Sequence, residues 1–365
     1  MAEWIHPEHS KGQVRRSGDI LRKSDHPFDE TEAISVLNNW KAAHELPLHY
    51  IVKKIQQYAD DVSDENTLVQ RRKRTESILL KLEQQPKLDL ARMQDLVGCR
   101  VVFRHEDSQK NLTCIENLIE KINMSSMESP LVRLTNYINE PRDTGYRSVH
   151  AIFKYKSDDY PRHKNMQVEL QIRTKMQHIW ATTVETVGMF EQSNLKQGIG
   201  DENWLEFFRQ MSYIMAIDEG TIEVSTEKRK SLCKELSNAE KKVRAGITLS
   251  GYAIAQKVLH NALEQIDDDN EMLELVSYIL MKLDLGPVVE NKEPSIDIET
   301  FTSEELGDAT EQYGIWENDA HDKKMCYVLL AKSQGANELR SGFPNYFADV
   351  HEFLRLLNRY ISEKQ

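Results

Sequence analysis

Hydrophobic and polar positions repeat with two different periods in the first half of the chain, so both helices and strands are expected there. Apolar residues recur at three-residue steps over residues 34–46 and continue over residues 50–58, which predicts two helices with a break at Pro47. Amphipathic helices are also expected over residues 75–82 and 108–122.

Alternation of apolar and polar side chains predicts the strands of this half. The β-rich segments are residues 100–103, 131–138, 148–156 and 166–174, and a helix over residues 175–187 is expected to follow the last of them. Strands that are interspersed with helices in this way predict a mixed α/β unit with a small sheet.

The strand over residues 166–174 has two chemically different faces. One face is apolar and suits a core, whereas Glu169, Gln171 and Arg173 share the other face. A carboxylate beside a fixed cation suits a site that handles phosphates and a metal ion. The alternative is an ordinary amphipathic strand whose polar face is solvated.

The chain after residue 200 is expected to be mainly helical. Helical spacing is present over residues 204–215, 228–245, 251–264 and 271–283. The second of these segments is rich in charge, which is typical of an exposed helix.

A separate small α/β unit is expected after Gly286-Pro287. Its strands are expected over residues 295–299 and 326–330, and its closing helix over residues 348–360. The acidic segment 308–323 is expected to be a loop or disordered.

These patterns predict four parts along the chain. Residues 1–30 are expected to be a flexible arm, 31–195 the α/β unit, 196–285 a helical extension, and 286–365 the small C-terminal α/β domain.

Composition narrows the class of protein. The chain has 365 residues, 39% of them hydrophobic, and a formal net charge of -12, which argues against binding nucleic acid through bulk charge. Its 4 cysteines form no Cys-x-x-Cys pair, so neither a zinc site nor a disulfide framework is expected. No signal peptide and no membrane-spanning run is evident, so the expected location is cytoplasmic.

A basic segment precedes and enters the helix over residues 75–82. Arg71 and Lys73 lead into it, and Ser77 and Lys81 are one helical turn apart on one face. A strip of positive charge with a hydroxyl suits a polyphosphate, whereas the alternative is a solvated basic helix end.

Two further segments contain candidate polar groups. Asp95 and Arg100 flank Gly98 at the start of a strand, where an aspartate is also a common turn former. Residues 137–150 place tyrosines, arginines and a histidine around a turn at Gly145. An aromatic ring beside arginines can stack a base and bind its phosphates, or it can simply pack against the core.

Together these segments resemble the synthetase domain of the RelA/SpoT family, which transfers pyrophosphate from ATP to the 3′ hydroxyl of a guanosine nucleotide. The resemblance covers about residues 35–190. Its most distinctive motifs are Gly-Tyr-Arg-Ser-x-His at 145–150 and Glu-x-Gln-Ile-Arg-Thr at 169–174. It implies a nucleotidyltransferase-like synthetase fold and the activity of a pyrophosphokinase.

The resemblance also implies roles for individual residues. The catalytic residues that would bind Mg²⁺ are Asp95 and Glu169, and Glu169 would also help to deprotonate the acceptor hydroxyl. The residues expected on the ATP side are Arg71, Lys73, Ser77, Lys81 and Arg100. The residues expected on the acceptor side are Arg142, Tyr146, His150, Gln171 and Arg173, with Tyr146 stacking on the acceptor base.

Four positions depart from the family pattern, all on or near the acceptor side. They are Asn136 for Asp, Arg142 for Lys, Thr144 for Asn, and Glu185-Thr186 for Glu-His. Pyrophosphate transfer is therefore better supported than the identity of the acceptor. No His-Asp cluster of the family's hydrolase domain is present, which indicates a synthetase alone.

Several alternatives remain open at this point. The product is expected to be a (p)ppGpp-type alarmone, with an adenosine alarmone or a toxin that pyrophosphorylates the 3′ end of tRNA as alternatives. A non-catalytic nucleotide sensor is a further alternative, which the intact Asp95 and Glu169 oppose. The C-terminal domain either supports stability and homo-oligomer formation, or restrains the enzyme until a protein or nucleotide trigger, such as a phage protein, binds. No membrane partner is expected.

Overall fold

The computed structural model describes residues 4–24, 30–73, 75–125, 128–191, 193–253, 276–284, 295–302, 304–321, 326–332 and 350–363. The chain divides into two compact units. The first is Met1–Glu140 with Arg147–Lys175, and the second is Pro141–Tyr146 with Met176–Gln365. Apart from the arm over residues 1–30, the division into four parts expected from the sequence remains a prediction.

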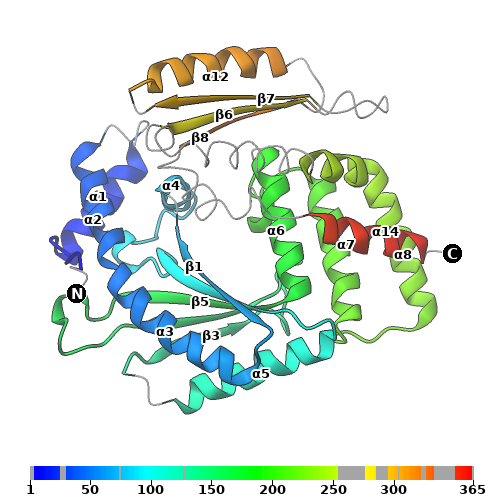
Figure 1. Ribbon diagram of the computed structural model, residues 1–365, viewed down its shortest axis with the longest axis horizontal. Coiled ribbons are helices and arrows are strands. Elements are labelled where there is room, and N and C mark those ends of the chain that lie inside the picture. Colours follow the sequence, from blue (N-terminus) through cyan, green and yellow to red (C-terminus); the bar gives the residue numbers. More distant parts are fainter. Residues whose placement is uncertain are drawn as a thin grey trace. The chain divides into compact units, whose positions relative to one another are not determined.

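A five-stranded mixed sheet is the centre of the first unit (Figure 1). Its strand order is β1-β2-β5-β4-β3. The strands are β1 Asn66–Arg72, β2 Val97–Phe103, β3 Leu131–Asn136, β4 Val149–Lys154 and β5 Gln167–Thr174. Only β2 and β5 are parallel neighbours, and the other pairs are antiparallel. The mixed α/β fold class is confirmed.

One face of this sheet forms the core with two helices. The buried cluster includes Leu170 and Ile172 of β5 and Ala151 of β4. The helices α3 Glu45–Val62 and α5 Ser108–Met124 contribute their apolar sides to the same cluster. Because successive residues of a strand point to opposite faces, the odd-numbered positions of β5 face away from this core.

The N-terminal helices build a second core beside the sheet. They are α1 Lys11–Lys23, α2 Thr31–Ala43 and α4 Thr75–Gln84. The expected flexible arm is wrong for its described part, because α1 is a helix with Val14 and Leu21 buried in this cluster. Ser10 and Gln13 form a capping box at its start, which is the sequence signal for that helix.

The helices and strands of the first unit agree with most of the expected pattern. The break between α2 and α3 falls at His44, so Pro47 lies in the first turn of α3 instead of between helices. Strand β1 was not predicted from the sequence. It pairs along the full length of β2, from Asn66 opposite Phe103 to Arg72 opposite Val97.

Helices dominate the second unit. They include α6 Lys175–Phe190, α7 Glu202–Asp218, α8 Thr226–Val243 and α14 His351–Ser362. The expected helices over residues 204–215, 228–245 and 348–360 are confirmed. Phe353 of α14 packs against Phe207 and Phe208 of α7. The C-terminal helix is therefore part of the helical core of this unit.

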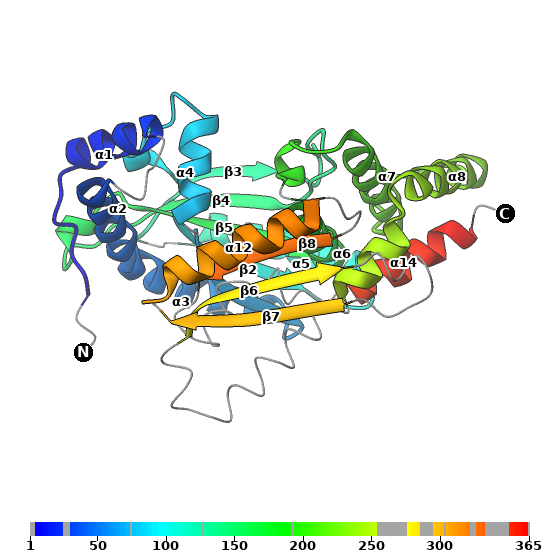
Figure 2. The same ribbon diagram turned by 90° about the horizontal axis from the view of Figure 1, so that it is seen from above.

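A small sheet precedes α14 in the chain (Figure 2). Its order is β7-β6-β8, with β6 Val276–Asp284, β7 Ser295–Thr302 and β8 Cys326–Lys332, all antiparallel. The helix α12 Leu306–His321 packs on it through Tyr313 and Trp316. The strands over 295–299 and 326–330 are confirmed, and these two aromatic residues belong to a core.

Two predictions in this region are wrong. The segment 276–283 is a strand instead of a helix, because its backbone pairs with β7 on one edge and with β8 on the other. The segment 308–321 is a helix instead of a loop, because Ala309, Tyr313 and Trp316 form a narrow apolar face. The helix predicted over residues 251–264 lies outside the described residues from residue 254 onward.

Within the described residues, the helices are too short or too polar to cross a membrane.

Candidate active site

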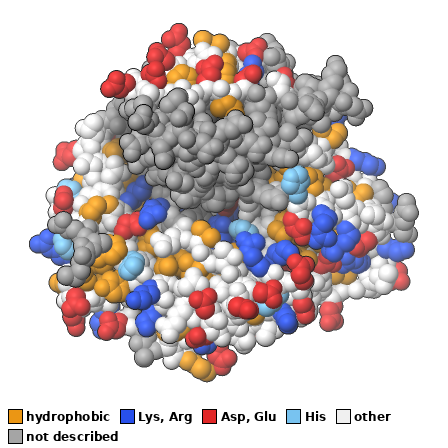
Figure 3. Space-filling view, viewed as in Figure 1, with side chains coloured by type: hydrophobic (Ala, Val, Ile, Leu, Met, Phe, Trp, Pro, Cys, Tyr) orange, Lys and Arg blue, Asp and Glu red, His pale blue; other side chains and the backbone are white. Residues whose placement is uncertain are grey.

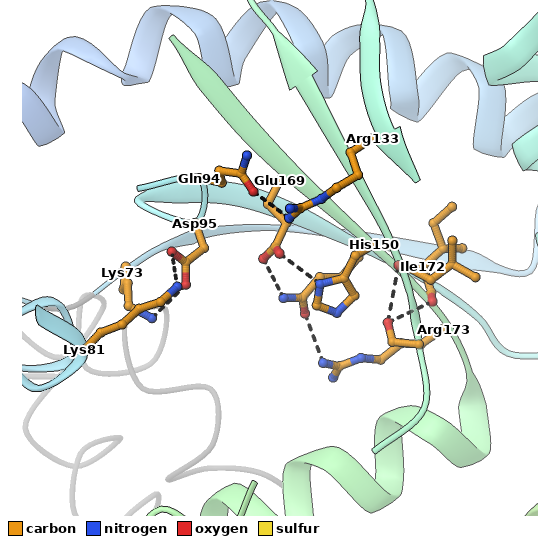
Figure 4. Close-up of polar contacts among 12 residues, drawn as sticks. Lys73, Lys81, Gln94, Asp95, Arg133, His150, Glu169, Ile172 and Arg173 are labelled. Atoms are coloured by element: carbon orange, nitrogen blue, oxygen red, sulfur yellow. Dashed lines mark hydrogen bonds and ion pairs between the residues drawn. The ribbon is translucent and has the colours of Figure 1, made fainter. Parts of the chain in front are cut away.

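A row of hydrogen bonds joins the polar side chains of β5 and β4 (Figure 4). His150 Nδ1 lies 2.9 Å from Glu169 Oε1, and Gln171 Nε2 donates to Glu169 Oε2 at 2.8 Å. Arg173 donates in turn to Gln171 Oε1 at 3.0 Å. Gln171 is 6% exposed and Arg173 is fully buried. The polar face expected for β5 is therefore an ordered network and not a solvated surface.

Strand register explains why these side chains meet. His150 of β4 is opposite Gln171 of β5, so both lie on the same face of the sheet as Glu169. Ser148, which precedes β4, donates from its hydroxyl to the carbonyl of Ile172 at 3.1 Å. The ring of Tyr137 lies edge-on to His150, with centroids 5.3 Å apart. These contacts fix the position of His150 against Glu169.

The environment of Glu169 keeps its carboxylate ionised. Burial raises the pKa of this group, but the hydrogen bond and the charge of His150 oppose burial and, with the Gln171 amide, lower the pKa to about 2. The negative charge of Asp95 acts in the opposite direction and raises the pKa of Glu169. The two carboxylates are therefore electrostatically coupled.

Asp95 is held by two lysines at the entrance to β2. Lys73 Nζ lies 3.0 Å from Oδ2 and Lys81 Nζ lies 2.8 Å from Oδ1 (Figure 4). Burial opposes ionisation of Asp95, but the two ammonium groups hold its pKa well below the ordinary value. A carboxylate fixed between two cations is a site of concentrated charge of both signs.

Gly98 brings the strand after Asp95 close to Glu169. It is opposite Glu169 in the parallel pair of β2 and β5. A Cβ atom at Gly98 would lie 2.4 Å from the carbonyl oxygen of Glu169, so a larger residue would force the two strands apart. Glycine at this position therefore sets the separation between the segments that carry the two acidic residues.

The two carboxylates fit a hard divalent cation by the chemistry of their donor atoms. Mg²⁺ prefers carboxylate oxygens and is commonly bound by one or two of them together with substrate phosphates. Each carboxylate offers more lone pairs than its present hydrogen bonds use. Among the described residues, no group of three or more His, Cys, Asp or Glu side chains has the arrangement of an all-protein metal site.

The structure brings together several of the residues expected on the ATP side. Lys73 and Lys81 meet at Asp95, and Ser77 is one turn before Lys81 on α4 and half-buried. Arg100 is opposite Gln171 in the sheet and buried. Arg71 pairs with Gly98 through its backbone in β1, and its side chain lies outside the described part.

The expected acceptor residues are divided between the two units. His150, Gln171 and Arg173 belong to the first unit, whereas Arg142 and Tyr146 belong to the second. Tyr146 is 1% exposed. The guanidinium of Arg142 lies 5.4 Å from the centroid of the Tyr146 ring.

Three residues near the network were missed in the sequence. Arg133 of β3 donates to the side-chain oxygen of Gln94 at 2.5 Å, and both lie beside Glu169 in Figure 4. Tyr137 contacts His150, although only its segment was singled out. Arg133 is opposite Ile152, which places it on the face of the sheet that holds His150. Strand alternation could have found Arg133 only once the pairing of β3 with β4 was known.

Comparisons with known proteins find matches over the part of the chain that holds this site. A family model described as the region found in RelA / SpoT proteins matches residues 70–193. The Bacillus subtilis protein named GTP pyrophosphokinase YjbM is 25% identical over 150 residues, which are 40% of this chain and 68% of that protein.

Solved structures of small alarmone synthetases are also similar. Small alarmone synthetase 1 from Bacillus subtilis, bound to its product pppGpp, is 21% identical and covers 49% of this chain and 90% of its own, with a TM-score of 0.40. Small alarmone synthetase 2 from Bacillus subtilis is 20% identical and covers 50% of this chain and 95% of its own, with a TM-score of 0.41.

The chain therefore carries a RelA/SpoT region at residues 70–193, and the resemblance noted in the sequence is confirmed. The matched region contains β1 from Gln70 onward and every later strand of the five-stranded sheet. It also contains every residue assigned above to the candidate site.

Proposed function

We propose that this protein is a pyrophosphokinase that transfers the β,γ-pyrophosphate of ATP to the 3′ hydroxyl of a guanosine nucleotide. The RelA/SpoT region supports the reaction class, as does the relative named GTP pyrophosphokinase. The observation that carries the proposal is the pair of carboxylates Asp95 and Glu169. Asp95 lies between Lys73 and Lys81, and Glu169 is held by His150 and Gln171.

Asp95 and Glu169 are the residues that would hold Mg²⁺. When bound, the ion would neutralise charge on the phosphates and orient them for displacement. Glu169 is kept ionised at neutral pH by His150 and Gln171, so its carboxylate is available without loss of a proton. The hydrogen bonds with the buried Gln171 and the half-buried His150 keep its orientation fixed.

The lysines and arginines near Asp95 are proposed to bind the triphosphate of ATP. Lys73 and Lys81 are flexible point charges that can leave Asp95 for a phosphate oxygen. Ser77 is suited to donate a hydrogen bond from the same helix. Arg71 and Arg100 are proposed to complete this side. Transfer of a phosphoryl-type group depends mainly on positioning and neutralised charge, which these residues supply.

Glu169 is proposed to act mainly by holding the metal and orienting the acceptor. A carboxylate with a pKa of about 2 is a weak base, so it takes little proton from a sugar hydroxyl before the bond to phosphorus forms. This suits a loose transition state, in which the attacking oxygen carries little charge until late. Arg142, His150, Gln171 and Arg173 are proposed to hold or organise the acceptor. Because Tyr146 is 1% exposed, its proposed stacking on the acceptor base requires that the ring become accessible when the acceptor binds.

The acceptor identity is the part of the proposal that most needs a direct test. The purified protein is incubated with γ-labelled ATP and, separately, GDP, GTP, adenosine nucleotides and deacylated tRNA. Label on the 3′ oxygen of GDP or GTP, with release of AMP, supports the proposal. Label on tRNA alone, or on an adenosine nucleotide alone, would replace the guanosine acceptor with that alternative.

The distribution of charge weighs against a large RNA footprint. The formal net charge is -12, and acidic and basic side chains are interspersed on the face in Figure 3. Extended contact with nucleic acid normally uses a clustered positive surface. A guanosine nucleotide needs only a few local cations, which the candidate site contains.

The small β6–β8 domain is proposed to regulate the synthetase region, with a protein or nucleotide as the trigger. A truncation at residue 285 would also remove α14 and its Phe353 contact with the helical core. Replacement of residues 254–349 by a short flexible linker keeps α14. Higher activity of this variant would support restraint, and unchanged activity would remove the regulatory proposal.

A further inference from the structure

The loop Pro141–Tyr146 is held by a helix that lies outside the RelA/SpoT match. That helix is α7, and the match ends at residue 193. We propose that Ser212 and Arg209 of α7 are positioning residues, which set the affinity for the acceptor through this loop. The inference rests on the proposed function, in which Arg142 and Tyr146 belong to the acceptor side.

The loop is closed by two of its own backbone hydrogen bonds. Gly145 donates to the carbonyl of Arg142 at 2.8 Å, and Arg142 donates to the carbonyl of Tyr146 at 3.2 Å. These bonds leave the carbonyls of Asp143 and Gly145 available for other donors. A loop that presents a stacking ring must keep both its turn and its orientation if the ring is to meet a base.

Helix α7 supplies donors to both of these carbonyls. The Ser212 hydroxyl donates to the oxygen of Gly145 at 2.5 Å, and the guanidinium of Arg209 donates to the oxygen of Asp143 at 2.8 Å. Ser212 is 3% exposed, so its hydrogen bond is shielded from water. The two donors are three residues apart and therefore lie on one side of the helix.

Gly145 permits this close approach of the loop to α7. Its φ is +86°, a conformation that other residues rarely adopt. A Cβ atom here would lie 3.0 Å from Cβ of Ser212 and 3.2 Å from Cα of Arg209. Glycine at this position therefore permits both the turn and the contact with α7. The contact connects the motif at residues 145–150 with a helix outside the matched residues 70–193.

The segment just before α7 fixes the tyrosine ring as well. Lys196 Nζ lies 5.0 Å from the centroid of the Tyr146 ring and forms an ion pair with Glu185 at 2.5 Å. Thr144 of the loop donates to the carbonyl of Lys196 at 3.5 Å. The ring of Trp180 lies 6.4 Å from that of Tyr146. Because the cation is held by Glu185, it keeps the aromatic ring in one orientation.

These contacts predict different effects on the KM for the acceptor and the KM for ATP. The loop and α7 belong to the second unit, whereas Lys73, Lys81 and Asp95 belong to the first. Loss of the hydrogen bond from α7 should therefore weaken binding of the acceptor and leave binding of ATP unchanged. A general loss of folding would instead lower the activity without changing the ratio of the two KM values.

The test compares Ser212→Ala with a matched serine variant on the next helix. Ser231 of α8 is exposed and donates to Glu235 of its own helix, so Ser231→Ala is the control. One uncharged hydrogen bond to a buried carbonyl corresponds to about a three- to tenfold change. We expect the KM for GDP to rise by that factor in Ser212→Ala, with the KM for ATP unchanged.

Arg209→Gln provides a second variant at a more exposed position. It should raise the KM for GDP in the same direction. Glu206→Gln is its control, because it removes the ion pair between Glu206 and Arg209 but leaves the bond to the carbonyl of Asp143 in place. Equal KM values for GDP in wild type, Ser212→Ala and Arg209→Gln would overturn the inference.

Hydrogen exchange gives a readout that does not depend on activity. The amides of Arg142 and Gly145 should exchange faster in Ser212→Ala, whereas the amides of β5 should not change. Unchanged exchange in the loop would overturn the inference. If the wild type transferred nothing to GDP, the proposed function would fail, and the exchange measurement would still decide whether Ser212 holds the loop.

Discussion

Removal of the lysines around Asp95 should change metal and nucleotide binding in opposite directions. Lys73 and Lys81 occupy the two oxygens of Asp95 at 3.0 and 2.8 Å. Their ammonium groups therefore compete with a divalent cation for this carboxylate. The same lysines are proposed to bind the phosphates of ATP, so their loss should weaken binding of the nucleotide.

The geometry sets the size of the expected effect. The side chains of Lys73, Lys81 and Asp95 are 12%, 29% and 20% exposed, so each pair is only partly shielded from water. A hydrogen bond between charged groups contributes about 1.5–3 kcal/mol when well shielded. Partial exposure reduces this to about 1.4 kcal/mol for each lysine, which is a tenfold change in affinity.

The assay measures binding of Mn²⁺ by the loss of its free electron paramagnetic resonance signal. Lys73→Met should bind Mn²⁺ about tenfold more tightly than wild type without nucleotide, and should bind α,β-methylene-ATP about tenfold more weakly by calorimetry. Lys87→Met is the matched control, because Lys87 is exposed in the loop after α4. Weaker or unchanged Mn²⁺ binding in Lys73→Met would refute the competition between lysine and metal.

Three further changes test the surroundings of the site and of the core. Burial lowers the pKa of His44 from 6.5 to about 4, so the neutral form stabilises the fold above pH 6.5, and stability is lost as the pH falls from 6.5 to 4. One pKa unit corresponds to about 1.4 kcal/mol, so His44→Gln should remove about 2 kcal/mol of the difference in unfolding free energy between pH 7.5 and pH 5. Equal pH dependence of stability in the wild type and the variant would contradict this. His150→Ala removes the group that lowers the pKa of Glu169, so the acid limb of kcat/KM should move to higher pH; an unmoved limb would count against that role. Gly98→Ala should destabilise the protein by about 1–3 kcal/mol in urea, because its Cβ would meet the carbonyl of Glu169 at 2.4 Å, whereas Gly12→Ala, with its nearest neighbour at 3.8 Å, should not.

Strand alternation predicted the sheet where one face is apolar and the other is polar. It placed β3, β4 and β5 and the faces of the last two, because burial of one face requires alternation. It missed β1, whose sequence Asn-Thr-Leu-Val-Gln-Arg-Arg has few apolar residues. The backbone of β1 is ordered by hydrogen bonds to β2, which a local pattern does not reveal.

The helices that were missed have narrow apolar faces. The buried positions of α1 are Val14, Ser17, Gly18 and Leu21, and half of these are not hydrophobic. Average composition therefore suggested an arm, although the capping box at Ser10 marked the start of a helix. The face of each such helix is completed by tertiary contacts and not by local propensity.

The sequence motifs identified the residues of the candidate site but not the tertiary contacts between them. The order along β5 identified Glu169, Gln171 and Arg173, and the structure joins them by hydrogen bonds. The contact of Asp95 with two lysines depends on how α4 and the loop before β2 pack, which spacing alone does not give. Ser212 donates to Gly145 of the loop Pro141–Tyr146, and these two residues are 67 positions apart in the sequence, so no local motif predicts the contact.

The central claim is that the pair Asp95 and Glu169 carries pyrophosphate transfer. The most direct measurement is the rate of AMP release from ATP in the presence of GDP, compared between wild type and Glu169→Gln. This change keeps the size of the side chain and removes its charge, so retained folding is checked by an unchanged melting temperature at pH 7.5. We predict a loss of about a thousandfold or more, the size expected for removal of a group that stabilises the transition state. A rate in Glu169→Gln within tenfold of the wild type would contradict the account.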